Sequence, residues 1–205
     1  HPSTLTSIDN MAVALQTQGQ YEEAETMHKR AVEGREKVLG HDHPDTLDSV
    51  NNLAIALQNQ EKYVQAEALN RRVLEGREKA LGREHPATLA SVNNLAITLQ
   101  GQEEYEKAEA MHRRALEGRE KVLGPNHPDT LDSLDSLGSV LESQGQYEKA
   151  EEMYRRAVDG MEKTLGSNHP DTLDSMDNLV RILQRQQKHE EAEVLRSRVR
   201  TSSSP

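Results

Sequence analysis

The dipeptide His-Pro occurs five times along this chain of 205 residues, always 42 positions apart. Other residues recur with the same spacing, for example Tyr21 and Tyr63, or Gly40 and Gly82. A fixed period in this range is typical of a solenoid, in which one small supersecondary unit is stacked on copies of itself. The sequence therefore predicts a single elongated array of five repeats. The expected repeats are residues 1–42, 43–84, 85–126, 127–168 and 169–200, followed by a polar tail over 201–205.

Each repeat has the pattern of two helices joined by a turn. In the second repeat, one apolar stripe follows the 3.6-residue helical period. Its members are Leu47, Val50, Leu53, Ala54 and Leu57. Pro44 suits the first helical position, because its missing N–H has no partner there. In the first repeat we expect the turn near 17–20, the second helix over 21–39 and a cap at Gly40. The residues expected on the buried side of that second helix are Ala24, Met27, Ala31, Val32, Val38 and Leu39.

Small residues are expected to let the helices approach each other closely. Ala54 in the first helix and Ala66 in the second have small counterparts in the other repeats, and facing small side chains allow a short interaxial distance. A glycine also recurs inside the second helix, although glycine costs about 1 kcal/mol there relative to alanine. We expect these glycines to pack against the first helix of the next repeat. They are Gly34, Gly76, Gly118 and Gly160.

These motifs resemble a known family. The run Asn-Leu-Ala-x-x-Leu-Gln-x-Gln-x-x-Tyr-x-x-Ala-Glu at 52–67, and Arg-Arg-Ala-Leu at 113–116, resemble the tetratricopeptide repeat. The 42-residue period and the His-Pro-Asp-Thr-Leu linker at 43–47 resemble the longer variant found in kinesin light chains. The run Glu-Gly-Arg-Glu-Lys-Val-Leu-Gly, at 33–40 and 117–124, resembles the C-terminal repeats of fungal NOD-like receptor proteins, in which a nucleotide-binding NACHT or NB-ARC domain precedes the repeats.

The resemblance implies an all-α fold, a right-handed superhelical α-solenoid of five helix-turn-helix repeats that binds a protein or an extended peptide. It carries over no ATP site, because the nucleotide-binding part of those receptors has no counterpart in these residues. We therefore expect no cofactor and no enzymatic activity. Phosphate-binding and nucleophile-elbow motifs are also missing from the sequence.

Composition narrows the classes of partner. The net charge is −10 and no basic stripe interrupts it, so nucleic acid is not an expected ligand. The sequence has no Trp, no Phe and only five Tyr on which bases could stack. No apolar run approaches the roughly 18 residues of a membrane span. The absence of cysteine fits a reducing compartment, and we expect a cytoplasmic protein.

One face of the first helix varies between repeats, while the apolar stripe behind it stays nearly constant. At 100° per residue, Asn51, Asn52, Ile55 and Asn59 project on the same side as Asp48. In tetratricopeptide arrays the first helices line a concave groove, so the resemblance makes this face the groove wall. The expected ligand-contacting residues are Asp48, Asn51, Asn52, Ile55, Asn93, Asn94, Ile97, Asp132, Asp135, Asp174, Asp177 and Arg181.

The chemistry of this set suggests a ligand. Asn51 and Asn93 can both donate and accept hydrogen bonds, as the backbone of an extended peptide requires. Ile55 and Ile97 add apolar surface, and the aspartates of the last two repeats make that end acidic. A peptide with an apolar centre and a basic segment would complement this surface. Kinesin light chains have the Asn-Asn pair that stands here at 51–52 and 93–94. They favour acidic cargo peptides, so the basic ligand expected for this chain departs from the kinesin-light-chain pattern.

A structural role for part of this set stays open. The column of Asn52, Asn94 and Asn178 could equally hydrogen-bond between neighbouring repeats without touching a ligand.

The histidines of successive His-Pro linkers are expected one repeat apart, at a distance of at least about 10 Å from each other. Because zinc ligands converge within about 2 Å of one ion, we expect no metal site. Arg71 follows Glu67 by four residues, which predicts an ordinary surface ion pair.

Three functions are compatible with such an array. The first is the sensor or partner-recognition array of a fungal NOD-like receptor, which would place it in innate immunity. The second is a cargo adaptor of the kinesin-light-chain type, and the third is an accessory repeat domain of an enzyme encoded upstream. The sequence begins at His1 without an initiator methionine, and its first helix carries Leu5, Ile8, Met11 and Leu15 with no preceding helix to cover them. We therefore expect an upstream segment, or self-association through the N-terminal end.

Overall fold

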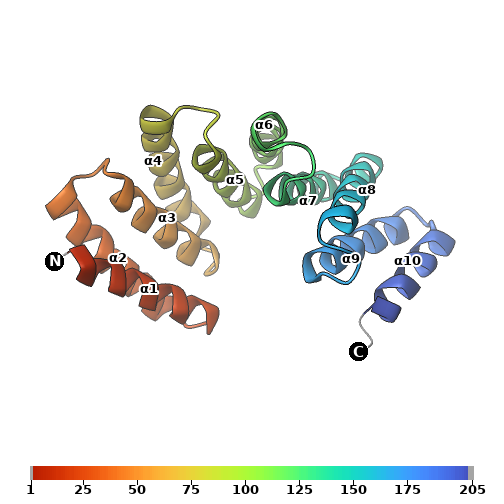
Figure 1. Cartoon of the computed structure of the whole chain (residues 1–205), viewed down its shortest axis with the longest axis horizontal. Coiled ribbons are helices and arrows are strands. Elements are labelled where there is room, and N and C mark those ends of the chain that lie inside the picture. The colour runs from red at the N-terminus through yellow and green to blue at the C-terminus, as the bar shows by residue number, and fades with distance from the viewer. Residues whose placement is uncertain (1, 203–205) are drawn as a thin grey trace. The chain divides into compact units, whose positions relative to one another are not determined.

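The computed structural model describes residues 2–202, and side chains over 3–199. The described chain consists of ten α-helices and contains no strand (Figure 1), as the repeat pattern predicts. The helices are α1 (Pro2–Thr17), α2 (Tyr21–Leu39), α3 (Pro44–Gln58), α4 (Tyr63–Leu81), α5 (Pro86–Gly101), α6 (Tyr105–Leu123), α7 (Pro128–Ser143), α8 (Tyr147–Thr164), α9 (Pro170–Arg185) and α10 (His189–Ser202). Helix α10 enters the segment expected as a tail, and 203–205 lie outside the described residues.

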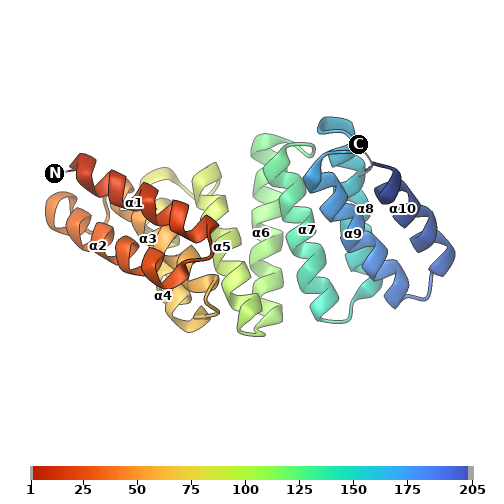
Figure 2. The same ribbon diagram turned by 90° about the horizontal axis from the view of Figure 1, so that it is seen from below.

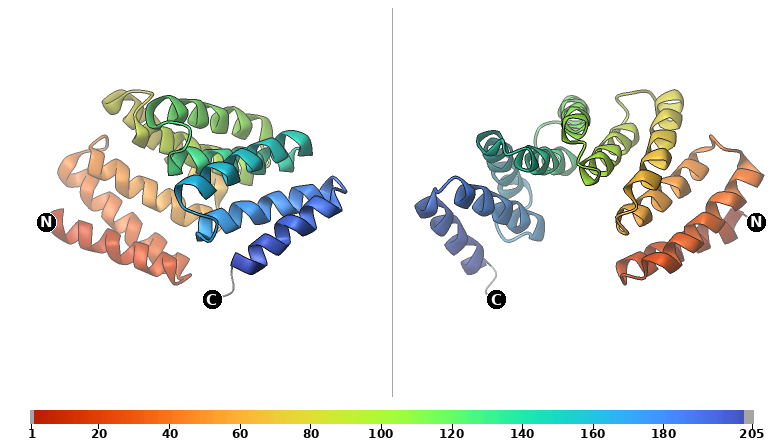
Figure 3. Two further views of the ribbon diagram at one scale, coloured as in Figure 1. Left: turned by 45° about the vertical axis from the view of Figure 1, so that its right-hand side comes forward. Right: turned by 180° about the vertical axis from the view of Figure 1, so that it is seen from behind.

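The helices group into two compact units. The N-terminal unit covers residues 1–104, with α1 to α5, and the C-terminal unit covers residues 105–205, with α6 to α10. Inside each unit every helix packs against its neighbours in sequence. Figure 2 shows α6 and α7 side by side, and Figure 3 shows α9 turning back into α10. Each unit is therefore a stack of helical hairpins.

The His-Pro dipeptide starts four of the first helices in the same way. His43 is the N-cap of α3, and its Nδ1 accepts a hydrogen bond from the backbone N–H of Asp45 at 3.2 Å. Pro44 occupies the first helical turn, as predicted. Residues His85, His127 and His169 cap their helices with the same bond. The histidine therefore supplies one acceptor for the N–H groups that a helix start leaves unpaired.

The predicted apolar stripe of the first helices forms the core. In α3 its members are at most 6% exposed, and α5 buries the equivalent set to the same degree. Ala54 and Ala66 are also fully buried. In the N-terminal unit, Val50, Leu53 and Leu57 of α3 form one cluster with Val32 of α2. The core of the second hairpin therefore extends to the helix before it.

The second helices differ from the prediction in two respects. Val38 was expected inside, but it is 59% exposed. It lies one turn beyond Gly34, where Leu5 packs, and α1 begins only three residues before Leu5, so Val38 lies near the end of the contact between the two helices. Three polar side chains that apolar patterning did not include, Glu25, His28 and Arg35, are buried as well.

Three of the glycines inside the second helices, Gly34, Gly76 and Gly160, pack against a different partner from the one expected. A Cβ on Gly76 would lie 2.6 Å from a methyl group of Leu47, which belongs to the first helix of the same repeat. Gly34 meets Leu5, and Gly160 meets Leu131, in the same way. The helices of a hairpin run antiparallel, so the end of the second crosses the start of the first. The glycine leaves room for that leucine.

A different close contact distinguishes the fourth repeat. A Cβ on Gly138 would lie 2.8–3.0 Å from the ring of Tyr154, which is fully buried. The first three repeats have an alanine where Gly138 stands, and a smaller side chain (His28, Asn70 or His112) where Tyr154 stands. The larger ring and the smaller facing residue therefore occur together.

The turn inside each repeat requires a left-handed backbone but not a glycine. Gly19 and Gly145 have φ of +76° and +75° at this position. Glu61, Glu103 and Gln187 take its place in the other repeats with φ near +60°. Non-glycine residues pay a conformational cost at such angles, so Gly19 and Gly145 form this turn with less strain than Glu61, Glu103 and Gln187.

Candidate ligand-binding surface

The predicted surface of the N-terminal unit is accessible but already hydrogen-bonded in part. Asp48 is exposed and pairs with Arg77 at 2.7 Å. Asn52 and Ile55 are half-buried, and Ile97 is 41% exposed. Two isoleucines at the same position of consecutive first helices therefore present apolar surface to solvent.

Asn51 and Asn94 bind each other. Asn94 Nδ2 donates to Asn51 Oδ1 at 3.0 Å, from α5 to α3. The backbone carbonyl of Asn94 accepts from Gln58 Nε2 at 2.9 Å and from Asn70 Nδ2 at 3.3 Å. Asn93 is half-buried beside them. Asn94 therefore has the inter-repeat bond that the alternative interpretation required, and its side chain remains on the predicted surface.

A buried polar network lies at the equivalent position of the first repeat. Asp9 is only 4% exposed. Its carboxylate lies 3.0 Å from His28 Nδ1 and 2.8 Å from Arg35 Nη1, and it accepts a hydrogen bond from Ser49 Oγ. The network joins α1, α2 and α3, and it satisfies a carboxylate that would be costly to bury alone. Asp9 therefore has a structural role.

Arginines of the second helices connect each repeat to the next, which the sequence reasoning missed. Arg35 Nη1 donates to the backbone carbonyl of Asp45 at 2.7 Å and to Ser49 Oγ at 2.6 Å. Arg77 and Arg119 make the same pair of bonds to the start of α5 and α7. The recurrence of Gly-Arg-Glu with the 42-residue period was the available signal. In the fourth repeat Met161 stands at this position and is buried.

A second polar link recurs on the turn side. Glu25 is buried and accepts from Gln60 Nε2 at 2.9 Å and from Lys62 Nζ at 2.8 Å. Hydrogen bonds from Lys29 and Lys62 hold the pKa of Glu25 at about 2. Glu151 accepts from Gln186 and Lys188 in the same geometry. The link therefore recurs in both compact units.

Ion pairs also line the second helices. Arg71 pairs with Glu67 at 2.6 Å, as the four-residue spacing predicts. The adjacent Arg72 reaches across to Glu36 of the preceding repeat, also at 2.6 Å, and donates to the backbone carbonyl of His41. Arg156 and Glu120 repeat this longer bridge. The Arg-Arg pairs therefore combine one bond within a helix and one between repeats.

The acidic residues of the C-terminal unit do come together on consecutive first helices. Asp132 on α7 and Asp174 and Asp177 on α9 are exposed, whereas Asp135 is half-buried. Asp135 accepts a hydrogen bond from Ser175 Oγ at 2.7 Å. Among the described residues it has no cationic partner, because Met161 occupies the position from which Arg35 reaches Asp9. Asp135 therefore occupies the position equivalent to Asp9 but lacks the arginine that pairs with the Asp9 carboxylate.

The environment of Asp135 makes its charge costly. The pKa of Asp135 is raised to about 7. Burial is the largest cause, the hydrogen bond from Ser175 acts against it, and the charges of Asp132 and Asp174 act with it. Although the Asp132 side chain is exposed, desolvation by its surroundings raises its pKa, and Arg119 acts in the opposite direction. A cation brought to this surface would favour the ionised form of both groups.

Arg181 has an internal partner. Its Nη2 lies 2.8 Å from Glu142 Oε2, and Arg185 lies 3.4 Å from the other carboxylate oxygen. Tyr154 also donates to Glu142, and burial raises the pKa of that phenol. Arg181 is exposed but held by this carboxylate. It therefore belongs to the surface without contributing a free charge.

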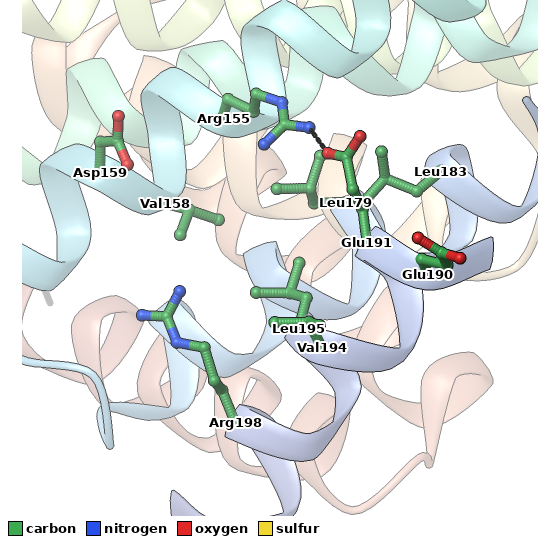
Figure 4. Close-up of a pocket in the computed structure, with 10 residues that line it drawn as sticks. All are labelled: Arg155, Val158, Asp159, Leu179, Leu183, Glu190, Glu191, Val194, Leu195 and Arg198. Atoms are coloured by element: carbon green, nitrogen blue, oxygen red, sulfur yellow. Dashed lines mark hydrogen bonds and ion pairs between the residues drawn. The ribbon is translucent and has the colours of Figure 1, made fainter. Parts of the chain in front are cut away.

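A cleft on another face of the C-terminal unit was not predicted. It has a volume of 450 Å³ and lies between α8, α9 and α10 (Figure 4). Leu179, Leu183 and Leu195 line it, and the Arg155–Glu191 ion pair spans one side. Because Leu195 and Leu179 are buried core residues, the cleft is a continuation of the hairpin packing.

No cluster of three or more His, Asp or Glu suited to a metal ion occurs among the described residues. Within 2–202, no helix is both long and apolar enough to cross a membrane.

Comparison with known proteins identifies the repeat. The tetratricopeptide repeat model matches residues 3–79, 48–121, 88–163 and 139–195. The chain belongs to the tetratricopeptide repeat family. No curated protein matches it. This fold is typical of protein-interaction modules and of kinesin-light-chain-like adaptors, and no catalytic family is indicated.

Solved structures share this tetratricopeptide fold. Nearly identical TPR-like repeats of a Podosopora anserina protein classed as a kinesin light chain are 32% identical, with a TM-score of 0.82 over 98% of this chain and 96% of that one. A substituted form of those repeats is 31% identical, with a TM-score of 0.84 over 98% and 95%. BtubC (BKLC) from P. vanneervenii is 20% identical, with a TM-score of 0.82 over 98% and 80%, which shows the fold alone.

Proposed function

We propose that this tetratricopeptide array binds an extended polypeptide that carries a basic segment, and that the acidic surface of the C-terminal unit receives that segment. The observation that carries the proposal is the missing cation at Asp135. The equivalent Asp9 is paired with Arg35 at 2.8 Å, whereas Met161 leaves Asp135 with only the Ser175 hydroxyl among the described residues. A lysine or arginine of a ligand would supply the missing charge.

The surroundings of Asp135 support a positively charged ligand. Asp132, Asp174 and Asp177 are exposed on the same two first helices, and Asp174 and Asp177 have no hydrogen bond or ion pair among the described residues. Complementary charge speeds association and selects partners, and its effect weakens as salt screens it. Because the pKa of Asp135 is about 7, a bound cation would also release a proton at neutral pH.

The N-terminal unit would bind a less charged part of the ligand. Ile55 and Ile97 offer apolar contact, and the side-chain amides of Asn51, Asn93 and Asn94 can pair with a peptide backbone. Asn94 Nδ2 has a second N–H beyond the one donated to Asn51. The Asn52 side chain has the same position one repeat earlier and makes no hydrogen bond within the described part of the chain.

At the level of the whole protein, we favour the partner-recognition array of a fungal NOD-like receptor, acting in the cytoplasm. The Glu-Gly-Arg-Glu-Lys-Val-Leu-Gly runs at 33–40 and 117–124 support this assignment. A kinesin-light-chain-type cargo adaptor is the alternative that the Podosopora anserina repeats favour, at 31–32% identity. The encoded sequence upstream of His1 distinguishes them: a nucleotide-binding domain fits the receptor, a coiled coil fits the adaptor and a hydrolase motif fits an enzyme.

Peptide selection tests the binding proposal. From a library of extended peptides, the chain should enrich ligands with a lysine or arginine segment, and their affinity should fall as salt rises. Changing Asp132, Asp135, Asp174 and Asp177 together to Asn should flatten that dependence. Neutralising the exposed acids Glu148, Glu152 and Asp159 of α8 is the matched control and should leave it unchanged. Enrichment of acidic peptides would contradict the proposal and favour the adaptor alternative.

A single substitution sharpens this test. Met161→Arg should place an internal cation beside Asp135, as Arg35 does beside Asp9, and so compete with the ligand's own charge. Affinity for a basic peptide should fall several-fold, and Met161→Leu should not change it. Equal affinity in both variants would show that Asp135 does not receive the ligand.

A further inference from the structure

Two repeats of this chain show how a first helix of the array binds a guanidinium group. In the first repeat, Arg35 Nη1 lies 2.8 Å from Asp9 Oδ2, and Arg35 Nη2 donates to Thr6 Oγ1 at 3.2 Å. In the second repeat, Arg77 Nη2 donates to Asp48 Oδ1 at 2.7 Å. Thr6 and Asp48 occupy the same repeat position. The first helix therefore has two positions whose side chains contact the arginine, that of Asp9 and that of Asp48.

The fourth repeat has an acid at both of these positions. Asp135 is the equivalent of Asp9, and Asp132 is the equivalent of Asp48. Met161 stands where the arginine stands in the other two repeats, and its thioether donates no hydrogen bond. The first and second repeats thus pair one carboxylate with one arginine, whereas the fourth repeat has two carboxylates and no arginine at that position.

Asp135 also lacks the second nitrogen partner of Asp9. His28 Nδ1 lies 3.0 Å from Asp9 Oδ1, but Tyr154 stands at the position of His28 in the fourth repeat. The Tyr154 hydroxyl donates to a different carboxylate. Within the described part of the chain, Asp135 keeps only the bond from Ser175 Oγ to its Oδ1. The other oxygen of the Asp135 carboxylate therefore has no donor there.

The two carboxylates are accessible from one side of α7. Asp132 is exposed and Asp135 is half-buried, whereas Asp9, which Arg35 contacts, is only 4% exposed. Asp132 makes no hydrogen bond or ion pair with the residues that the structure describes. Residues three apart on a helix have Cβ atoms about 5–6 Å from each other. One planar group that carries donors on two sides can therefore reach both carboxylates.

We propose that Asp132 and Asp135 form an arginine site, in which one guanidinium group of the ligand donates to Asp135 through one terminal nitrogen and to Asp132 through the other. This inference rests on the proposed function, which requires a cation but does not choose between lysine and arginine. Ser175 holds the Asp135 carboxylate in the orientation that leaves one oxygen for the ligand. Asp174 and Asp177 on α9 add negative charge without direct contact.

Lysine fits this pair of carboxylates less well. Its ammonium is a compact, strongly hydrated point charge, whereas the guanidinium is planar, more weakly hydrated and presents its donors in a fork. The arginine inside the first repeat uses that fork, because Arg35 contacts Asp9 through Nη1 and Thr6 through Nη2. We therefore expect the site to select arginine over lysine at equal net charge.

Three peptides of equal length measure this selectivity. They are acetyl-(Gly-Ser-Arg)3-amide and the same peptide with lysine or citrulline in place of arginine. Citrulline keeps the planar shape of arginine but carries no charge. NMR titration of the full chain at low salt should give a Kd at least about fivefold lower for the arginine peptide than for the lysine peptide, and the citrulline peptide should bind most weakly. The side-chain carboxyl signals of Asp132 and Asp135 should shift when the arginine peptide binds.

Single neutralisations locate the guanidinium group. Asp132→Asn and Asp135→Asn should each bring the ratio of the lysine-peptide Kd to the arginine-peptide Kd close to one, because the fork then has a carboxylate on one side only. Asp174→Asn is the matched control, since it removes one charge from the same surface outside the site. It should weaken both peptides alike and keep the ratio. Unchanged circular dichroism shows that each variant is folded.

The outcomes separate this inference from the function on which it rests. Equal Kd values for the lysine and arginine peptides in the parent chain overturn the arginine site and leave the binding of a basic segment in place. A ratio that persists in Asp132→Asn and Asp135→Asn also overturns it, because the guanidinium group then lies elsewhere. If neither basic peptide binds more tightly than the citrulline peptide, the proposed function fails and the inference fails with it.

Discussion

Asn94 Nδ2 donates a hydrogen bond to Asn51 Oδ1 at 3.0 Å and so connects the first helices of two consecutive repeats. Its backbone carbonyl also receives Gln58 and Asn70 from the preceding repeat. Asn94 therefore holds two repeats in register at the centre of the predicted ligand surface. Under the proposed function, a change at this residue would affect both stability and binding, and a comparison of the repeat sequences does not separate the two effects.

We expect Asn94→Ala to lower the free energy of unfolding by about 1 kcal/mol, because a partly buried amide pair is lost. The equivalent Asn52→Ala, one repeat earlier, removes no hydrogen bond between described residues and should change stability by less than about 0.5 kcal/mol. Urea denaturation of the two variants measures the difference. Equal losses would show that the Asn94–Asn51 bond contributes nothing net.

The pKa of Asp135 should respond to a single substitution at Met161. An arginine there would stand beside Asp135 as Arg35 stands beside Asp9, and an opposite charge at this distance lowers a carboxyl pKa by about 1 to 3. NMR titration of the Asp135 side chain in Met161→Arg should show that drop from its value of about 7. Met161→Leu adds no charge and should leave the titration in place; a similar drop there would point to altered packing instead.

Stability should depend on pH through the same carboxyl. Because the folded pKa of Asp135 is about 7, above its ordinary value of 3.8, the folded chain holds this proton between those pH values while the unfolded chain releases it. Asp135 therefore lowers the free energy of unfolding progressively as pH rises from about 4 to 7, and the whole penalty is present above 7. Asp135→Asn should be more stable than the parent at about pH 7.5, with the difference shrinking toward about pH 4. A constant difference across this range would contradict the raised pKa.

The fold follows from features that the sequence displays directly. The period fixes five repeats, and the stripe of Leu47, Val50, Leu53 and Leu57 fixes the inward face of each first helix. The proline fixes where that helix starts. These signals are local, so they can be read without knowing which helices lie together.

The contacts between helices could not be read in the same way. Arg35 and His28 are polar, and the contacts that allow their burial, such as those to Asp9 and Ser49, come from other helices. Gly34 was matched to the wrong helix, since its sequence position does not show that Leu5 of the same hairpin lies against it. Projection of the first helices on a helical wheel predicted the acidic surface. The absence of a cationic partner for Asp135 is recognised only by comparing its surroundings with those of the equivalent Asp9. A comparison of Arg35 with Met161 across repeats was the available signal.

Gly138 and Tyr154 provide a test of packing inside one hairpin. A Cβ on Gly138 would lie 2.8 Å from the Tyr154 ring, which is fully buried, so neither group has room to move. We expect Gly138→Ala to destabilise the chain by about 1–3 kcal/mol through overpacking. Tyr154→His alone should also destabilise, because it leaves space beside Gly138 and removes the bond to Glu142.

The double variant should then be more stable than the sum of the single changes predicts. Alanine facing histidine is the combination that the first repeat has, at Ala12 with His28. Contacting residues commonly show coupling of about 0.5–3 kcal/mol, and here the sign should be favourable because the smaller ring accepts the added methyl group. Thermal or urea unfolding of all four proteins gives this coupling. A coupling near zero would mean that Gly138 is not required by the tyrosine, and that their joint occurrence in the fourth repeat has another origin.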